Sequence, residues 1–170
     1  VSPSTGQVGM RVTVTGVNML GGGSSLSSIT FAGVAPSSIT SSNDTVIEVR
    51  LASNNAGVGS VVITGSDGTI LTAIDAFTYQ VASEVTSVDP STGQLGTVVT
   101  ISGTNLLGQG ASASDTITSL VVGDLTTQPV SANQTHIIFI ARNGSEGAAD
   151  IQLEATSGAT TLSSGDFAYT

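Results

Sequence analysis

Few side chains in this sequence have the chemistry of catalysis. His136 is the only histidine, and no Gly-x-Ser-x-Gly elbow surrounds any serine that it could activate. The residues around it alternate, which places His136 on the strand face opposite Ile137 and Phe139, and therefore toward solvent. We predict no catalytic residue and no enzymatic activity.

The acidic residues do not form a recognisable metal site. They sit singly in predicted turns, such as those at Asp67, Asp115, Asp124 and Glu146. No calcium loop of the Asp-x-[Asp/Asn]-x-[Asp/Asn]-Gly type is present, and without cysteine there is neither a thiolate metal site nor a disulfide. We expect no metal and no cofactor. A calcium ion near Glu84 and Asp89 remains an open alternative.

Two glycine runs resemble phosphate-binding loops in glycine content alone. They are Gly21-Gly22-Gly23 and Gly108-Gln109-Gly110, and each follows Asn-x-Leu with no predicted helix behind it. The chain contains no lysine, so the residue that contacts the phosphates in such loops is missing. We predict that both runs are ordinary loops.

The charge of the chain excludes two classes of partner. The formal net charge is −9, with 12 acidic residues against Arg11, Arg50 and Arg142. Nucleic acids and anionic membranes bind clusters of Lys and Arg, and three scattered arginines make none. No apolar run is long enough to span a bilayer. We therefore expect no nucleic acid partner and no direct membrane insertion.

Three Asn-x-[Ser/Thr] sequons are candidate N-glycosylation sites, at Asn43, Asn133 and Asn143. The first two occupy equivalent predicted turns before the same strand, where a glycan would be tolerated. If the chain is not exposed to a glycosylation machinery, these triplets are ordinary Asx turns.

The elements that carry these residues occur twice. The segment from Pro3 to Gly23 returns from Pro90 to Gly110 with most positions identical, and the Phe-x-Tyr at Phe77 returns at Phe167. Extra residues in the second copy fall within 111–117. We predict two domains, residues 1–81 and 82–170, joined by a short stiff linker. Because it begins at Val1-Ser2-Pro3, we expect the chain to be a segment of a longer protein.

The sequence pattern of each copy is typical of a β-sandwich. Val12 and Val14 alternate with polar neighbours, Ile47, Val49 and Leu51 do the same, and turn residues separate such runs at short intervals. No helical period is sustained. The predicted fold class is all-β, with two tandem immunoglobulin-like sandwiches.

The repeated residues resemble the IPT/TIG family of immunoglobulin-like domains. The shared pattern is P-x-x-G-x-x-G-x-x-V-T-I-x-G-x-N-L, which lies at Pro3 to Leu20 and at Pro90 to Leu107, and each copy closes with Phe-x-Tyr. The resemblance covers nearly the whole chain. It implies the immunoglobulin-like architecture but no single function, since such domains serve adhesion, signalling, enzyme accessory and DNA-binding roles.

From these observations we predict a non-catalytic structural or adhesive module at the cell surface or outside the cell. It would be a segment of a longer tandem array of immunoglobulin-like domains that forms a stalk or fibre and mediates protein-protein or cell-surface contacts. Its partners would be proteins, either neighbouring modules or other copies of the chain, or a cell-surface glycan. The alternative is an accessory carbohydrate-binding or spacer module of a secreted polysaccharide-acting enzyme. Flanking sequence with more repeats would favour the first interpretation, and a catalytic domain the second.

One strand offers a candidate contact surface. If Ile137 and Phe139 face the core, then His136, Ile138 and Ile140 lie on the outer face of the same strand. The matching positions in the first copy are Val46, Glu48 and Arg50, a common solvated pattern. Apolar residues gathered on an outer face tend to mark interaction sites.

Overall fold

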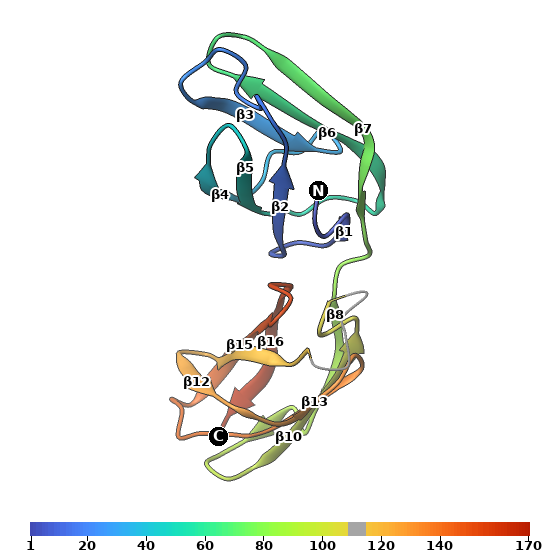
Figure 1. Cartoon of the computed structure of the whole chain (residues 1–170). Coiled ribbons are helices and arrows are strands. Elements are labelled where there is room, and N and C mark those ends of the chain that lie inside the picture. The colour runs from blue at the N-terminus through green and yellow to red at the C-terminus, as the bar shows by residue number, and fades with distance from the viewer. Residues whose placement is uncertain (109–114) are drawn as a thin grey trace. The chain divides into compact units, whose positions relative to one another are not determined.

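The computed structural model describes residues 1–108 and 115–170, and those residues form strands and loops without a helix (Figure 1). They divide into two compact units, Val1–Val81 and Ala82–Thr170. Each unit contains two sheets, which confirms the predicted all-β class. Most of the expected insertion at 111–117, and the Gln109-Gly110 part of the second glycine run, lie outside the described residues.

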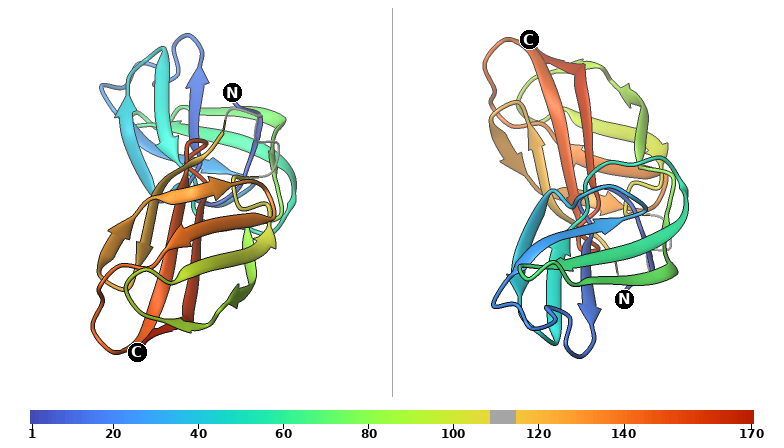
Figure 2. Two further views of the ribbon diagram at one scale, coloured as in Figure 1. Left: turned by 90° about the horizontal axis from the view of Figure 1, so that it is seen from below. Right: turned by 90° about the horizontal axis from the view of Figure 1, so that it is seen from above.

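The first unit consists of a four-stranded and a three-stranded sheet, and Figure 2 shows its strands in two layers. The four-stranded sheet has the order β1 (Thr5–Gly6), β7 (Ile70–Tyr79), β6 (Gly57–Gly65), β3 (Leu26–Phe31). The three-stranded sheet has the order β2 (Arg11–Thr15), β5 (Val46–Arg50), β4 (Ser38–Ser42).

The second unit repeats this plan with two additional strands, β8 and β12. One sheet has the order β13 (Pro129–Ala132), β14 (His136–Ile140), β10 (Val98–Thr104), β8 (Glu84–Asp89). The other has the order β12 (Leu125–Thr127), β11 (Ile117–Val122), β15 (Gly147–Ala155), β16 (Thr160–Tyr169), β9 (Thr92–Gly93).

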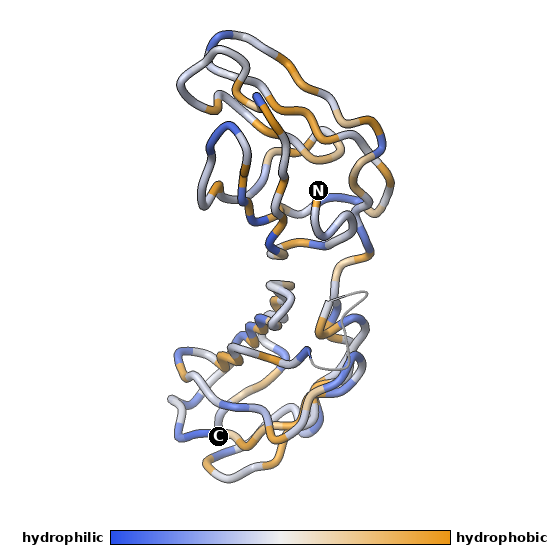
Figure 3. Tube along the Cα trace, viewed as in Figure 1, coloured by the Kyte–Doolittle hydropathy of each residue, from blue (hydrophilic) through white to orange (hydrophobic). Residues whose placement is uncertain are grey.

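The strands form where the sequence alternates apolar and polar residues, as the colouring of Figure 3 shows along the chain. In β2 the side chains of Val12 and Val14 are buried while Arg11 and Thr15 are exposed. The side chains of an extended chain point to opposite faces in turn, so one face of each such strand enters the core. The predicted inward positions of both copies are buried.

Aromatic rings occupy the centre of each core. Phe77 contacts Phe31 edge to face at 5.3 Å and Tyr79 at 5.2 Å between ring centroids, and Phe167 contacts Tyr169 in the same way at 5.1 Å. The Phe-x-Tyr of the last strand places both of its rings on the buried face, because they are two residues apart. The motif at the end of each repeat therefore contributes two aromatic rings to the core.

The first glycine run serves the fold. The backbone N–H of Gly22 donates to Asp67 Oδ2 at 2.9 Å, and Asp67 also accepts from the Thr69 N–H in the turn between β6 and β7. A carboxylate from within the same unit thus occupies the position where a phosphate-binding loop would hold its anion.

Candidate contact surface

The predicted contact strand, β14, lies between β13 and β10 in the second unit. Its register with β10 pairs Ile140 with Val98 and Ile138 with Thr100. Directly paired residues point to the same face, so Val98 joins the two isoleucines on the outside of the sheet. Ile137 and Phe139 are fully buried on the inner face.

Four aliphatic side chains form the outer surface of this sheet, and we call them the apolar face: Val98, Val130, Ile138 and Ile140. Val98 is 58% exposed, Val130 66% and Ile140 46%, whereas Ile138 is half-buried. Val130 lies in the β-bulge between Pro129 and Ser131, where β13 pairs with β14. The apolar face therefore crosses three strands.

The same positions in the first unit carry charged and polar side chains. Arg11 pairs with Arg50 where Val98 pairs with Ile140, and Glu48 takes the place of Ile138. Thr40 matches Val130 at the bulge of β4. These four residues line a shallow cavity of about 350 Å³. The two units therefore share the pairing of these three strands and differ in the chemistry of the outer face that the strands form.

Sequence analysis missed Val98 and Val130. The alternation of β10 does reveal the outward position of Val98, since Val99 and Ile101 are the buried members of that strand. Val130 carries no such signal, because the bulge interrupts the alternation of β13.

His136 is exposed at the start of β14 and takes part in a turn. Its Nδ1 lies 2.9 Å from Thr135 Oγ1, and its backbone N–H donates to Asn133 Oδ1 at 2.8 Å. These contacts give the imidazole no carboxylate to orient it as a general base. His136 therefore contributes polarity at one end of the apolar face.

Two of the three sequon asparagines have the same local structure. Asn43 Oδ1 accepts hydrogen bonds from the backbone N–H groups of Thr45 and Val46, and Asn133 Oδ1 does so from Thr135 and His136. These are Asx turns that lead into β5 and β14. Asn143 is also exposed but lies in the loop before β15, and no hydrogen bond holds its side chain within the described residues.

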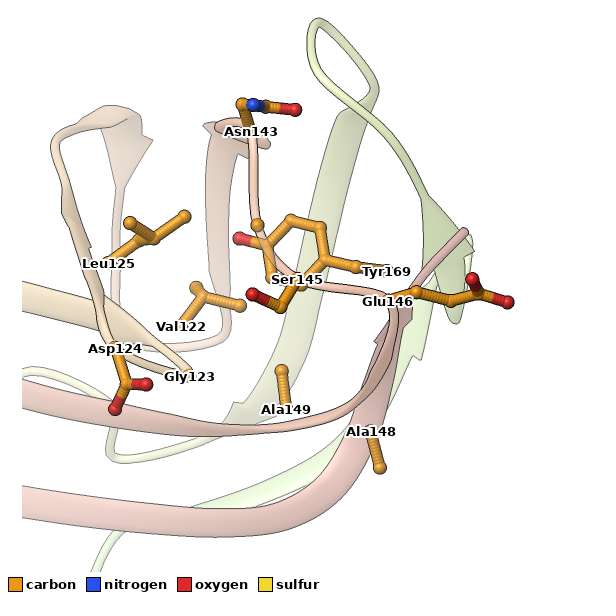
Figure 4. Close-up of a pocket in the computed structure, with 11 residues that line it drawn as sticks. Val122, Gly123, Asp124, Leu125, Asn143, Ser145, Glu146, Ala148, Ala149 and Tyr169 are labelled. Atoms are coloured by element: carbon orange, nitrogen blue, oxygen red, sulfur yellow. The ribbon is translucent and has the colours of Figure 1, made fainter.

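A small pocket opens at one end of the second unit, between the β11–β12 turn and the loop before β15 (Figure 4). Its volume is about 230 Å³, below the roughly 300 to 1,000 Å³ of most small-molecule sites. Figure 4 shows the Tyr169 hydroxyl directed into it, and burial raises the pKa of that hydroxyl while Arg142 lowers it. Asp124 and Glu146 line the rim.

The acidic residues do not gather into a cation site. Among residues 1–108 and 115–170, no group of three or more His, Cys, Asp or Glu side chains could hold a metal ion. Glu84 and Asp89, the proposed calcium ligands, stand at opposite ends of β8. Since a strand rises about 3.4 Å per residue, they are too far apart to share one ion.

No helix in the described part of the chain is long and apolar enough to cross a bilayer.

A family model described as IPT/TIG domain matches residues 1–79 and again residues 83–169. The sequence has no significant match among curated proteins.

Three solved structures match this chain with different degrees of similarity. The plexin A4 extracellular region, domains 1 to 10, is 19% identical with a TM-score of 0.54, over 99% of this chain and 15% of that one. A Bacteroides ovatus SGBP-B from a mixed-linkage glucan utilisation locus is 19% identical with a TM-score of 0.41, over 100% and 45%. The γ-CGTase of an alkalophilic Bacillus clarkii is 14% identical with a TM-score of 0.42, over 96% and 21%. The chain thus spans less than half of each of these proteins.

Proposed function

Because the chain belongs to the IPT/TIG domain family, we propose that it is a non-catalytic structural or adhesive segment of a cell-surface or extracellular protein, with contacts made through the apolar face of its second unit. Exposed aliphatic side chains on three neighbouring strands support this proposal. The stiff, short connection expected between the units suits a segment that sets spacing in an array.

The chemistry of the apolar face favours a protein partner. Valine and isoleucine side chains on a sheet pack well against the side chains of another sheet, as the two layers of a sandwich do. We infer that the occupant is the same face of a second copy, since a flat aliphatic surface is complementary to itself under twofold symmetry. A standard interface buries about 800 Å² on each partner and contains more side chains than these four. We therefore expect the contact to be weak.

The alternative, a carbohydrate-binding accessory module, has less support. Sugar-binding surfaces commonly present aromatic rings, and all six aromatic residues of this chain are buried: Phe31, Phe77, Tyr79, Phe139, Phe167 and Tyr169. No ring is therefore available as a platform. Titration with soluble β-glucan oligosaccharides is expected to give no binding heat, and saturable binding would favour the accessory role instead.

The apolar face is tested by copying the first unit onto the second with Ile138→Glu and Ile140→Arg. Sedimentation equilibrium of the whole chain is expected to show self-association with a dissociation constant on the order of a millimolar, lost in the double variant. Full burial of one isoleucine contributes about 1.5 to 3 kcal/mol, so removing two is enough to abolish so weak a contact.

The reciprocal variant, Glu48→Ile with Arg50→Ile, is the matched control. It makes two of the four equivalent positions of the first unit apolar and is expected to strengthen association. Circular dichroism during heating must show that both variants stay folded. A wild-type chain that stays monomeric at millimolar concentration, or equal association in wild type and Ile138→Glu/Ile140→Arg, would refute contact between copies.

A further inference from the structure

The loop before β15 contains the one Asn-Gly dipeptide of the chain, Asn143-Gly144. A glycine after asparagine leaves the backbone nitrogen accessible, because no Cβ shields it and the backbone adopts many conformations. Asn143 is exposed and outside any strand. Figure 4 shows its side chain projecting from the outer end of the loop, with no labelled side chain against its amide.

We propose that Asn143 is a site of spontaneous deamidation in the folded protein. The deprotonated backbone nitrogen of Gly144 attacks Cγ of Asn143, a C–N bond forms, and the side-chain amide leaves as ammonia after gaining a proton. The five-membered succinimide then takes up water at either carbonyl. The product is aspartate or isoaspartate, and the only co-reactant is water.

The contrast with the other two sequons explains why Asn143 reacts and they do not. The Oδ1 atoms of Asn43 and Asn133 each accept two backbone N–H groups and a threonine hydroxyl. Such an Asx turn holds the amide away from the following nitrogen, and that nitrogen belongs to Asp44 or Gln134, which carry side chains. Among the described residues nothing holds the Asn143 amide or the Gly144 N–H.

The chain also contains an Asp-Gly dipeptide, Asp67-Gly68, which is an internal control. Succinimide formation from aspartate requires its neutral carboxyl group as the electrophile. Both Asp67 oxygens accept hydrogen bonds, from Thr69 and from the Gly22 N–H, so this side chain is fixed and stays ionised. Of the four side chains compared, Asn143 alone combines a neutral electrophile with a following glycine N–H for which the described residues provide no hydrogen bond.

The reaction changes the pocket end of the second unit. It adds a carboxylate to the loop that also contains Glu146, one residue after Arg142, which is the only Lys or Arg of that unit. The isoaspartate form also lengthens the loop backbone by one methylene, where Gly144 packs so closely on Tyr169 that an added Cβ would lie 2.5 Å from the ring. A glycan on the Asn143 amide would block the attack, so the two modifications exclude each other.

The test is incubation of the whole native chain at 37 °C over several weeks at a series of pH values, followed by peptide mapping. We expect the peptide with Asn143 to acquire the mass of the acid, with release of one equivalent of ammonia and labelling by an isoaspartyl methyltransferase. The rate should rise in proportion to hydroxide, because the attacking nitrogen must lose its proton.

Asn143→Gln is the matched variant, since glutamine would need a less favourable six-membered ring, and it should abolish the labelling. Peptides with Asn43, Asn133 and Asp67 should stay unchanged in the same sample. Gly144→Ala is unsuitable because of the Tyr169 contact. Intact Asn143 in the native chain, with conversion only after unfolding in urea, would overturn the proposal.

Discussion

The two units differ most clearly along one edge of the sandwich. In the second unit β8 pairs with β10 from Glu84 to Asp89, and Ser83 Oγ hydrogen bonds to Thr161 Oγ1 of β16. In the first unit the matching edge of β2 has one bridge, between Ser2 and Thr13. Residues 82–170 therefore include a full strand at this edge, whereas residues 1–81 include one bridge.

The two units also differ in the burial of the side chains beneath that edge. Thr161 and Ser163 are each 7% exposed under β8, whereas their counterparts Leu71 and Ala73 are exposed in the first unit. With Pro3 aligned on Pro90, the counterparts of Glu84–Val88 would precede Val1, so residues 1–81 contain no counterpart of β8 and leave Leu71 and Ala73 exposed.

Breaking one core at a time is expected to give the largest effect. Phe77 and Phe167 are fully buried in matching positions, and replacement by alanine should cost about 3 to 5 kcal/mol in either case. If the units fold independently, Phe77→Ala destabilises residues 1–81 alone and Phe167→Ala residues 82–170 alone. Hydrogen exchange resolved by peptide measures this, and loss of protection in both units from either change would contradict independence.

A pair of glycines probes the edge itself. A Cβ on Gly103 would lie 2.2 Å from the carbonyl oxygen of Glu84 in β8, so Gly103→Ala must push the strands apart and should cost about 1 to 3 kcal/mol. The equivalent Gly16 faces only the flexible Met19 side chain, 2.9 Å from the added carbon. Urea denaturation should show a smaller loss for Gly16→Ala. Equal losses would mean that β8 does not determine the difference.

Adding a strand along β2 should reduce the difference between the two units at this edge. A copy of residues 83–87 fused ahead of Val1 is expected to extend the bridge at Ser2 into a strand along β2 and to cover Leu71. The gain for the first unit should be about 1 to 3 kcal/mol from added hydrogen bonds and burial. Thermal unfolding measures it against a Gly-Ser extension of equal length, and equal melting temperatures would show that the edge does not accept a strand.

The smallest expected effect is a loss of stability of the first unit at acidic pH. Hydrogen bonds from the backbone and hydroxyl of Thr69, and from the Gly22 N–H, lower the pKa of Asp67. A folded-state pKa below the unfolded value contributes stability that is present above the unfolded pKa and lost as the pH falls through the folded one. The first unit should therefore lose some stability on acidification below about pH 4.

The second unit offers the control, because Ser157 replaces Asp67 there and its uncharged Oγ donates to the Leu107 carbonyl. Asp67→Asn should make the first unit less sensitive to acid at this turn without changing the second. Identical pH profiles for the wild type and Asp67→Asn would contradict the assignment.

The architecture could be predicted from the amino-acid sequence alone. Alternation, turn residues and the return of Pro3–Gly23 at Pro90–Gly110 are local signals, and a strand with period two can bury only one of its faces. For the same reason Ile138 and Ile140 were predicted on the outer face, opposite the buried Ile137 and Phe139, as β14 has them. Membership of the IPT/TIG family was likewise readable from the repeated motif and is confirmed by the match over both copies.

The exposure of those outer positions and the residues that surround them depend on how the strands pair. Register placed Val98 beside Ile140, a bulge added Val130, and neighbouring strands left Ile138 half-buried. These properties arise from pairing between strands, which the alternation within a single strand does not contain.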